Sequence, residues 1–285
     1  MRMEINGETK IAGVIGWPID HSLSPIMHNY IASEMGHNLV YAAMPVSPEN
    51  AEKAIKGIGA LGFVGINVTA PHKYKAMAAV DKLSDNARLY GSVNTVVNRN
   101  GVLTGYSTDG PGLFKAVQRK GIEIERKNIL VLGAGGVAAP VCIMLAENKA
   151  GRVTIKNRTE QKAVKLGEFV KTASGYEPEI LSGEISEKYD VVINCTSLGM
   201  KHSENESPID DFSFITKDTA VVDLIYNPAK TLFLREAEKR GAVTLNGMGM
   251  LVYQGIIAYE KFMDCTLPDD MGDKLIKYLE TRFGN

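Results

Sequence analysis

The chain has 285 residues, of which 45% are hydrophobic and 23% are charged, and its net charge is −1. This composition is typical of a soluble globular protein, and the length allows two domains of ordinary size. The small net charge excludes the broad basic surface expected of a nucleic-acid-binding protein. No apolar run approaches the ~20 residues of a membrane-spanning helix, and the polar N-terminus lacks the apolar core of a signal peptide, so we expect a cytoplasmic protein.

The three cysteines, Cys142, Cys195 and Cys265, lie far apart in the sequence. Their spacing excludes a CxxC-type zinc site and provides no disulfide framework. We expect free thiols in a reducing compartment. The histidines also match no metal-binding spacing, so we expect no metal.

The first part of the chain alternates predicted strands and helices in a repeated β-α-β order. Ser24-Pro25 and Ser47-Pro48 are typical of helix starts, with each serine as the N-cap. The Asn100-Gly101 pair favours a tight hairpin turn. The repeated order implies a largely parallel sheet covered by helices. We predict strands at residues 10–16, 39–46, 63–69, 92–98 and 102–108, and helices at residues 24–36, 47–61 and from about residue 72.

The second part of the chain follows the pattern of a doubly wound nucleotide-binding domain. Strands are predicted at residues 128–136, 152–157, 190–197, 220–226 and 242–247. Residues 248–263 have helical spacing and follow the last of these strands, so we expect a terminal helix that returns to the first domain. The predicted fold is α/β. An N-terminal α/β substrate domain is formed by residues 1–109 and 247–285, and a Rossmann-like dinucleotide-binding domain by residues 110–246.

A glycine-rich turn, with Gly133, Gly135 and Ala138, matches the pattern G-x-G-x-x-G/A. The match has the required context, since it follows a predicted strand and precedes a predicted helix at residues 137–148. Glycines permit the tight turn and let a pyrophosphate approach the N–H groups at the helix start. We expect this turn to bind a dinucleotide; a plain strand-to-helix turn is the alternative.

The next strand ends at Lys156-Asn157-Arg158-Thr159, where NAD-binding domains usually have a carboxylate for the ribose 2′-hydroxyl. This segment has no carboxylate, and it offers two cations and a hydroxyl group to a 2′-phosphate. We therefore expect NADP as the cofactor, with NAD as a weaker alternative. The other interpretation is that Lys156 and Arg158 are solvated surface charges.

Lys73 lies where the strand at residues 63–69 gives way to a helix, close to the small polar residues Asn67 and Thr69. An enzyme that moves hydride to or from a carbinol carbon needs a group that manages the hydroxyl proton. Lys73 suits this role, either as a proton carrier or as a cation that stabilises an alkoxide. Asp109, at the junction of the predicted domains, is the best acidic partner. A solvated lysine at a helix start is the alternative.

Several longer motifs occur along the chain in the order "HSLSPIMHN", "GINVTAPHK", "GSVNTVVN", "STDGPGL", "VLGAGGVAAPV", "KNRT", "INCTSLGM", "DLIYNP" and "NGMGMLVYQG". With these motifs the sequence closely resembles the shikimate dehydrogenase family, from about Ile11 to Phe262. The resemblance implies NADP-dependent interconversion of 3-dehydroshikimate and shikimate in aromatic amino-acid biosynthesis.

The resemblance also implies roles for individual residues. Lys73 and Asp109 would be the catalytic pair. The residues expected to bind the substrate are Ser22 and Ser24 at its carboxylate, Asn67, Thr69 and Asn94 at its ring hydroxyls, and Tyr226 and Gln254, which would close the pocket. The residues expected to bind the cofactor are Asp85, Gly133, Ala134, Gly135, Gly136, Val137, Asn157, Arg158, Thr159, Thr196, Ser197, Leu224 and Gly247.

The chain departs from the family pattern at three positions. Ser107 stands where Asn is common before "TDG", Asn246 where Asp is common before Gly247, and Ala70 where a branched residue is common before Pro71. None of these departures removes a catalytic group, and they bear on cofactor affinity and substrate choice.

Three functions remain open at this point. The first is a biosynthetic shikimate dehydrogenase that uses NADP. The second is a quinate/shikimate dehydrogenase of broader use that also accepts NAD. The third is a ligand-binding regulator without turnover, which the presence of Lys73 and Asp109 disfavours. We expect a small-molecule substrate, no nucleic-acid or membrane partner, and a monomer or homodimer.

Overall fold

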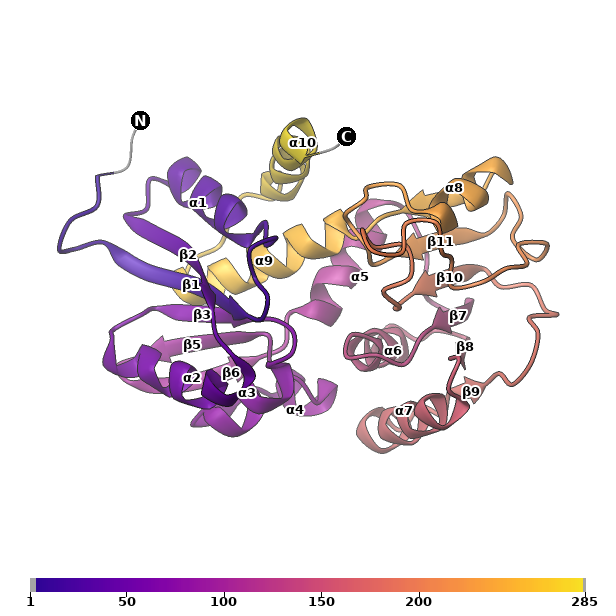
Figure 1. Cartoon of the computed structure of the whole chain (residues 1–285), viewed down its shortest axis with the longest axis horizontal. Coiled ribbons are helices and arrows are strands. Elements are labelled where there is room, and N and C mark those ends of the chain that lie inside the picture. Colours follow the sequence, from indigo (N-terminus) through magenta and orange to yellow (C-terminus); the bar gives the residue numbers. More distant parts are fainter. Residues whose placement is uncertain (1–3, 284–285) are drawn as a thin grey trace. The chain divides into compact units, whose positions relative to one another are not determined.

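The computed structural model describes residues 4–283 and divides them into two compact units, both of α/β type (Figure 1). Residues up to Thr108 and Val252–Arg282 form the first unit, and Asp109–Leu251 form most of the second. Helix α9 (Met248–Met263) begins in the second unit and continues into the first, to which α10 (Met271–Phe283) belongs up to Arg282. The expected return of the chain end to the first unit is therefore confirmed.

The first unit contains a six-stranded sheet in the order β2-β1-β3-β5-β6-β4. Strands β1 (Lys10–Gly16), β2 (Leu39–Pro45) and β3 (Gly65–Val68) run parallel to one another, as the repeated β-α-β order predicts. The hairpin strands β5 (Thr95–Arg99) and β6 (Val102–Tyr106) make the sheet mixed, since β5 is antiparallel to both β3 and β6. The two-residue strand β4 (Lys82–Leu83) pairs in parallel with β6.

The hairpin turn forms as the Asn-Gly pair predicts. Asn100 (φ 53°) and Gly101 (φ 85°) both have left-handed backbone conformations, which a two-residue type I′ turn requires. Oδ1 of Asn98 accepts a hydrogen bond from the N–H of Gly101 (2.9 Å) and closes the turn.

The helices of the first unit correct two predictions about helix starts. Helix α1 (Ser24–Met35) has Leu23, not Ser24, at its N-cap, because Ser24 is already the first residue of the helix. Ser47 precedes a short 3₁₀ turn at Pro48–Asn50 and makes no side-chain cap, and α2 (Ala51–Ala60) begins after that turn. The remaining helices, α3 (Lys73–Ala79) and α4 (Asp85–Tyr90), are short.

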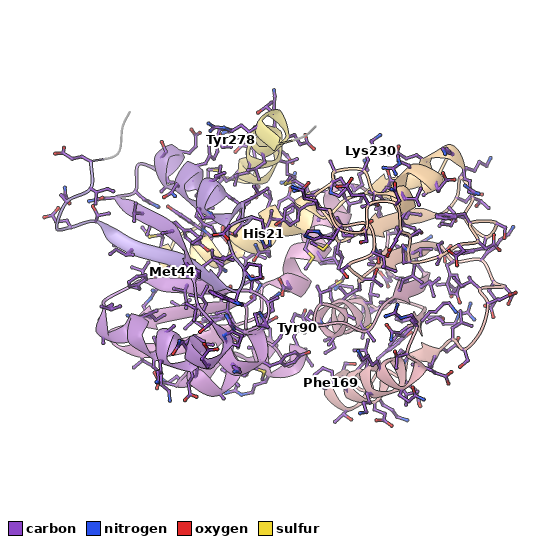
Figure 2. All side chains as sticks on the ribbon, in the orientation of Figure 1. His21, Met44, Tyr90, Phe169, Lys230 and Tyr278 are labelled. Atoms are coloured by element: carbon purple, nitrogen blue, oxygen red, sulfur yellow. The ribbon has the colours of Figure 1, made fainter. Side chains whose placement is uncertain are left out.

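The two C-terminal helices pack on the first unit through aromatic side chains. Tyr278 of α10, labelled in Figure 2, lies against Tyr30 of α1 with ring centroids 4.3 Å apart. Tyr259 of α9 hydrogen-bonds to Nδ1 of His37 (2.8 Å). Tyr259 and Phe262 are fully buried, so the chain end completes the core of this unit.

The second unit is a parallel sheet in the order β12-β11-β10-β7-β8-β9. Numbered from its own first strand, this order is 6-5-4-1-2-3, which is the Rossmann arrangement. The strand order reverses between β7 and β10, and the carboxyl ends of strands at such a switch point are where these folds bind ligands. The strands are β7 (Asn128–Leu132), β8 (Arg152–Lys156), β9 (Glu179–Ile180), β10 (Val191–Asn194), β11 (Ala220–Asp223) and β12 (Val243–Leu245).

Helices α5 (Asp109–Arg119), α6 (Ala138–Glu147), α7 (Glu160–Ser174) and α8 (Leu232–Lys239) accompany these strands. Strands β10 and β11 end three residues earlier than predicted. Oδ1 of Asn194 accepts the N–H of Thr196 (2.9 Å), and Oδ1 of Asp223 accepts the N–H of Ile225 (3.1 Å). Such side-chain bonds turn the backbone and so end a strand.

Each unit has its own apolar core. Ile15, Ile66 and Val96 are fully buried in the core of the first unit, as are Leu130, Val192 and Phe233 in that of the second. None of the helices within residues 4–283 has the length and apolar character needed to cross a membrane.

Candidate active site

The connection from β3 to α3 carries polar residues at one edge of the first sheet. Asn67 is buried, while its two neighbours in β3 belong to the apolar core. The N–H of Thr69 donates to the carbonyl of Ile15 (3.0 Å), and its carbonyl accepts from the N–H of His72 (2.9 Å). Lys73 is half-buried and is the first residue of α3. The strand end therefore presents Asn67, Thr69 and Lys73 from one short, anchored segment.

Both ends of the Asn67 amide are hydrogen-bonded. Oδ1 accepts from the hydroxyl group of Tyr41 (2.7 Å), and Nδ2 donates to the carbonyl of Asn94 (3.2 Å) and the hydroxyl of Thr95 (3.0 Å). Tyr41 also shares a side-chain hydrogen bond with Ser24, and burial raises its pKa well above the ordinary value. The phenol is therefore neutral and available as a donor.

A second amide, that of Asn94, joins the same cluster to the C-terminal helix. Its Oδ1 accepts from the N–H of Thr108 (2.8 Å), and its Nδ2 donates to Oγ1 of Thr108 (3.0 Å) and Oε1 of Gln254 (3.5 Å). Gln254 lies on α9 within the first unit. Residues far apart in the sequence thus meet in one buried polar cluster.

The serines expected at the substrate carboxylate lie before and at the start of α1. Oγ of Ser22 accepts the N–H of Ser24 (3.3 Å), which is the first N–H of the helix. Ser24 is joined to Asn67 through Tyr41. The structure therefore links five predicted substrate residues of this unit, namely Ser22, Ser24, Asn67, Asn94 and Gln254.

Sequence reasoning missed three members of this cluster: Tyr41, Thr95 and Thr108. Thr108 directly precedes Asp109 in the "STDGPGL" motif, so the motif could have identified it. Tyr41 had no such signal, since a tyrosine in an apolar strand is ordinarily a packing residue.

A buried histidine packs against Tyr41 of this cluster. The ring of His28 stacks on that of Tyr41, with centroids 4.1 Å apart and an interplanar angle of 3°. Among the described residues, neither ring nitrogen of His28 has a hydrogen-bond partner. Desolvation lowers the pKa of His28 to about 3, so the ring is neutral at ordinary pH.

In the second unit, the glycine turn follows β7 at the switch point. Gly133 has φ 103°, and an added Cβ would lie 2.7 Å from Cγ2 of Thr196, so the fold itself requires glycine there. Gly136 has no atom within 4 Å of such a Cβ, and Gly135 has only a carbonyl oxygen at 3.8 Å. Both are exposed, so the fold leaves their outer side open to a ligand such as a pyrophosphate. Ala134 and Val137 complete this turn.

The loop after β8 is tied to the glycine turn by Asn157. Its Oδ1 accepts the N–H of Ala134 (3.1 Å), and its Nδ2 donates to the carbonyl of Thr159 (2.8 Å). Arg158 and Thr159 are exposed. The amine of Lys156, by contrast, donates to the carbonyl of Gly183. Of the two cations predicted to meet a 2′-phosphate, only Arg158 lies in the exposed part of this loop.

Thr196 and Ser197 follow β10 across the switch point from the glycine turn. The hydroxyl of Thr196 donates to Oδ1 of Asn194 (2.7 Å) and accepts the N–H of Leu198 (3.1 Å). Asn194 in turn donates to Asp223. Burial raises the pKa of Asp223, an effect that its hydrogen bonds oppose.

Leu224, Tyr226 and Gly247 lie where the chain leaves β11 and β12. The N–H of Gly247 donates to the carbonyl of Ile225 (2.9 Å). An added Cβ on Gly247 would collide with the backbone carbonyl of Leu224, so this close approach requires glycine. Tyr226 is half-buried, and desolvation raises its pKa.

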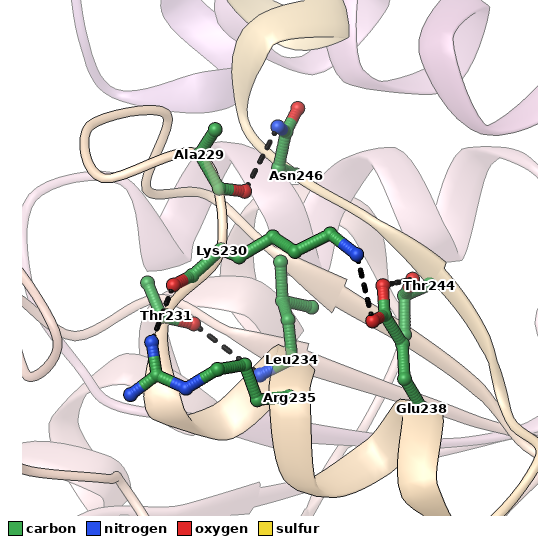
Figure 3. Close-up of polar contacts among 8 residues, drawn as sticks. All are labelled: Ala229, Lys230, Thr231, Leu234, Arg235, Glu238, Thr244 and Asn246. Atoms are coloured by element: carbon green, nitrogen blue, oxygen red, sulfur yellow. Dashed lines mark hydrogen bonds and ion pairs between the residues drawn. The ribbon is translucent and has the colours of Figure 1, made fainter. Parts of the chain in front are cut away.

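Asn246, one of the departures from the family pattern, makes a contact that an ionised aspartate cannot make. Its Nδ2 donates to the carbonyl of Ala229 (3.1 Å) (Figure 3). Its Oδ1 accepts the N–H of Met248 (3.1 Å). The same loop is held at Lys230, whose amine pairs with Glu238 (2.9 Å). Asn246 therefore fastens the loop that carries Tyr226 to the start of α9.

The two remaining predicted residues are carboxylates at helix starts. Asp85 begins α4 and forms an exposed ion pair with Arg88 (2.9 Å), outside the polar cluster of the first unit. Asp109 is buried and begins α5 in the second unit, whereas Lys73 lies in the first. The pairing of Lys73 with Asp109 therefore remains a prediction. Within residues 4–283, no group of His, Cys, Asp or Glu side chains is arranged to hold a metal ion.

Comparisons with known proteins agree with this geometry. Residues 14–96 match the family model of the shikimate dehydrogenase substrate binding domain, and residues 115–224 match that of shikimate / quinate 5-dehydrogenase. A shikimate dehydrogenase (NADP(+)) from Methanococcus maripaludis strain C7 is 43% identical over 257 residues, which cover 89% of this chain and 91% of that protein.

Two solved structures of shikimate dehydrogenases are also similar to this chain. A shikimate dehydrogenase in complex with NADP+ has a TM-score of 0.89 and 38% identity, and the match covers 96% of this chain and 97% of that one. The shikimate 5-dehydrogenase from Listeria monocytogenes, in complex with shikimate and NAD, has a TM-score of 0.89 and 34% identity, with 98% and 99% of the chains covered.

Proposed function

Because the chain belongs to the shikimate dehydrogenase family, we propose that it catalyses the reversible, NADP-dependent reduction of 3-dehydroshikimate to shikimate through the residues described above. The main observation behind these residue roles is the polar cluster of the first unit, in which the buried residues Ser24, Asn67 and Asn94 are joined to Gln254. Its amides and hydroxyls suit a ligand that is rich in hydroxyl groups.

The second unit would hold NADP at the carboxyl ends of its strands. The open side of Gly135 and Gly136 suits the pyrophosphate, and the exposed Arg158 and Thr159 suit the 2′-phosphate. Ala134, Val137 and Asn157 shape this site, and Thr196, Ser197, Leu224 and Gly247 border it from the neighbouring strands. When bound, NADPH supplies the hydride that reduces the carbonyl carbon of the substrate.

Lys73 and Asp109 would manage the proton that accompanies hydride transfer. In the direction of reduction, the ammonium group of Lys73 stabilises negative charge on the carbonyl oxygen and delivers a proton to it. Asp109 would orient Lys73 and take part in returning its proton. In the reverse direction the same groups remove the proton of the substrate hydroxyl.

The other residues would hold the ring in position. Ser22 and Ser24 would bind the substrate carboxylate, and Asn67, Thr69 and Asn94 would bind ring hydroxyls. Tyr226 and Gln254 close the pocket. Asp85, which lies in an exposed ion pair, is the weakest member of the proposed set.

A quinate/shikimate dehydrogenase that tolerates NAD is the second candidate. It is supported by the similar structure from Listeria monocytogenes, which contains NAD. Initial rates with shikimate and quinate, each with NADP and NAD, separate the two candidates. We expect the highest kcat/KM for shikimate with NADP. A higher value for quinate or for NAD would favour the second candidate, and no turnover of either substrate would contradict both. The expected cytoplasmic location, and the monomer or homodimer, remain predictions.

A further inference from the structure

We propose that Asn194 and Asp223 form a buried positioning pair that sets the shape of the Thr196–Ser197 turn for binding the dinucleotide. This inference rests on the proposed role of that turn in holding NADP. Neither residue was predicted to take part in binding, and neither reaches the surface, since both side chains are 0% exposed.

The sheet brings the two residues together. Asn194 is the last residue of β10 and Asp223 the last of β11, and the parallel register pairs them directly. Nδ2 of Asn194 donates to Oδ1 of Asp223 (3.0 Å). The pair therefore lies at the carboxyl edge of the sheet, immediately before two of the loops that border the proposed cofactor site.

Asp223 decides which way the Asn194 amide points. A carboxylate only accepts hydrogen bonds, so it takes the amide nitrogen and leaves Oδ1 directed at Thr196. That oxygen accepts both the N–H (2.9 Å) and the hydroxyl (2.7 Å) of Thr196. A flipped amide would place its NH₂ group against the N–H of Thr196, and the turn would lose both bonds.

These hydrogen bonds also determine which groups of the Thr196–Ser197 turn can bind a ligand. The hydroxyl of Thr196 gives its proton to Asn194 and accepts the N–H of Leu198 (3.1 Å), so it has no proton left for a phosphate oxygen. Ser197 is exposed. We infer that the turn meets the acceptor-rich dinucleotide through Ser197 and main-chain groups, while Thr196 holds the turn in shape.

Asp223 is itself held by two further donors. Oδ1 also accepts the N–H of Ile225 (3.1 Å), and Oδ2 accepts the hydroxyl of Thr231 (2.6 Å). Thr231 in turn caps α8 by accepting the N–H of Leu234 (Figure 3). With both oxygens accepting, an amide at position 223 would direct its NH₂ either at the N–H of Ile225, which cannot accept it, or at the hydroxyl of Thr231, which can turn to accept it.

An exchange of the two side chains tests this pair. Asn194→Asp places two buried carboxylates about 3.0 Å apart, and Asp223→Asn places two amides together. Asn194→Asp should weaken NADP binding roughly 10- to 100-fold, because the two carboxylates repel each other and the charge-assisted bond that fixes the turn is lost. Asp223→Asn should weaken it less, because Oδ1 of the new amide can still accept from Asn194 while the hydroxyl of Thr231 turns to accept its NH₂. The exchanged variant, N194D/D223N, removes the repulsion, and its carboxylate at position 194 can still accept both groups of Thr196, but its amide at position 223 no longer accepts the N–H of Ile225. It should therefore bind NADP more tightly than Asn194→Asp and more weakly than wild type.

The readouts are the Kd of NADP by calorimetry and the KM values for NADP and shikimate. The KM for shikimate should change less than the KM for NADP, because Tyr226 is the only proposed substrate-binding residue that follows this pair in the second unit. Thr231→Val is the matched control: it removes the α8 cap and one bond to Asp223 but leaves the Asn194–Asp223 contact. It should lower the melting temperature and keep the Kd of NADP within about twofold of wild type.

The pair has no positioning role if Asn194→Asp binds NADP as wild type does, or if the exchanged variant binds no better than Asn194→Asp. Equal weakening by Thr231→Val would assign the effect to general destabilisation. If a single variant does not fold, the exchanged variant compared with wild type decides. Failure of the proposed function appears separately, as wild-type protein that binds NADP but does not oxidise shikimate.

Discussion

The hydroxyl group of Tyr41 donates a 2.7 Å hydrogen bond to Oδ1 of Asn67, and both side chains are buried in the first unit. Together with the bonds from Nδ2 to Asn94 and Thr95, this bond fixes the orientation of the Asn67 amide. It also joins a residue of β2 to the polar end of β3, although β1 separates these strands in the sheet. The proposed substrate residues therefore depend on a side chain that the sequence did not identify.

Tyr41→Phe should raise the KM for shikimate roughly 3- to 10-fold and leave the KM for NADP unchanged. A neutral hydrogen bond contributes about 0.5–1.5 kcal/mol, and the phenylalanine ring still stacks on His28. Steady-state kinetics with each substrate varied in turn measure the effect. An unchanged KM for shikimate would mean that the Asn67 amide needs no support from Tyr41.

His28 should make the protein sensitive to acid. The pKa of His28 falls from 6.5 to about 3 on folding, so between these pH values the unfolded chain binds more protons than the folded one. The free energy of unfolding should therefore decrease as the pH is lowered from about 6.5, by up to about 1.4 kcal/mol per pH unit from this residue.

Urea unfolding of wild type and His28→Phe between pH 7 and pH 4.5 checks this. The variant should lose less stability with falling pH, because its ring does not titrate. His202→Phe is the matched control, since it makes the same substitution at an exposed position. Parallel curves for wild type and His28→Phe would contradict the burial of a neutral ring.

Lys73→Ala should lower kcat by ~10²-fold or more with little change in substrate binding, because both proton management and charge stabilisation are lost. Asp109→Asn should act similarly, and the double variant should be little worse than either single if the two residues act as a unit. Lys75→Ala is the control, since the Lys75 amine donates to the carbonyl of Pro48 on the surface. Multiplicative losses in the double variant would indicate independent roles.

Arg158→Ala should weaken NADP about 10- to 100-fold and leave NAD nearly unchanged, because each charge-assisted hydrogen bond to a phosphate contributes about 1.5–3 kcal/mol. Lys156→Ala should have a much smaller effect, since its amine is bonded to Gly183. The measurement is kcat/KM for both cofactors at saturating shikimate. Equal weakening of NADP and NAD by Arg158→Ala would show that this guanidinium does not bind the 2′-phosphate.

Two glycines of the same turn should respond differently to alanine. Gly133→Ala should lower stability by at least ~1 kcal/mol, because its φ of 103° and the nearby Thr196 methyl both oppose a Cβ. Gly135→Ala should leave the melting temperature unchanged, since the nearest atom to its Cβ is 3.8 Å away. It should nevertheless raise the KM for NADP, because the pyrophosphate needs this side of the turn. An unchanged KM would place the pyrophosphate elsewhere.

Local sequence patterns determined much of this protein. The alternation of strands and helices predicted both sheets and the Rossmann-like second domain, and Asn100-Gly101 predicted the hairpin turn. These features arise from residues close together in the chain, whose conformational preferences act locally.

Only the tertiary structure decided which distant polar groups meet. Tyr41 reaches Asn67, and Asn194 reaches Asp223, because the order and register of the strands place them together. The hydrophobic periodicity of a sequence specifies neither the strand order nor the register. The same limit explains the N-cap error at Ser24, where the hydroxyl of Ser22 takes a backbone N–H instead. A hydrogen bond needs a donor–acceptor distance of about 3 Å and a nearly linear angle. Residues far apart in the sequence meet these conditions only when the packed core holds both of them in place.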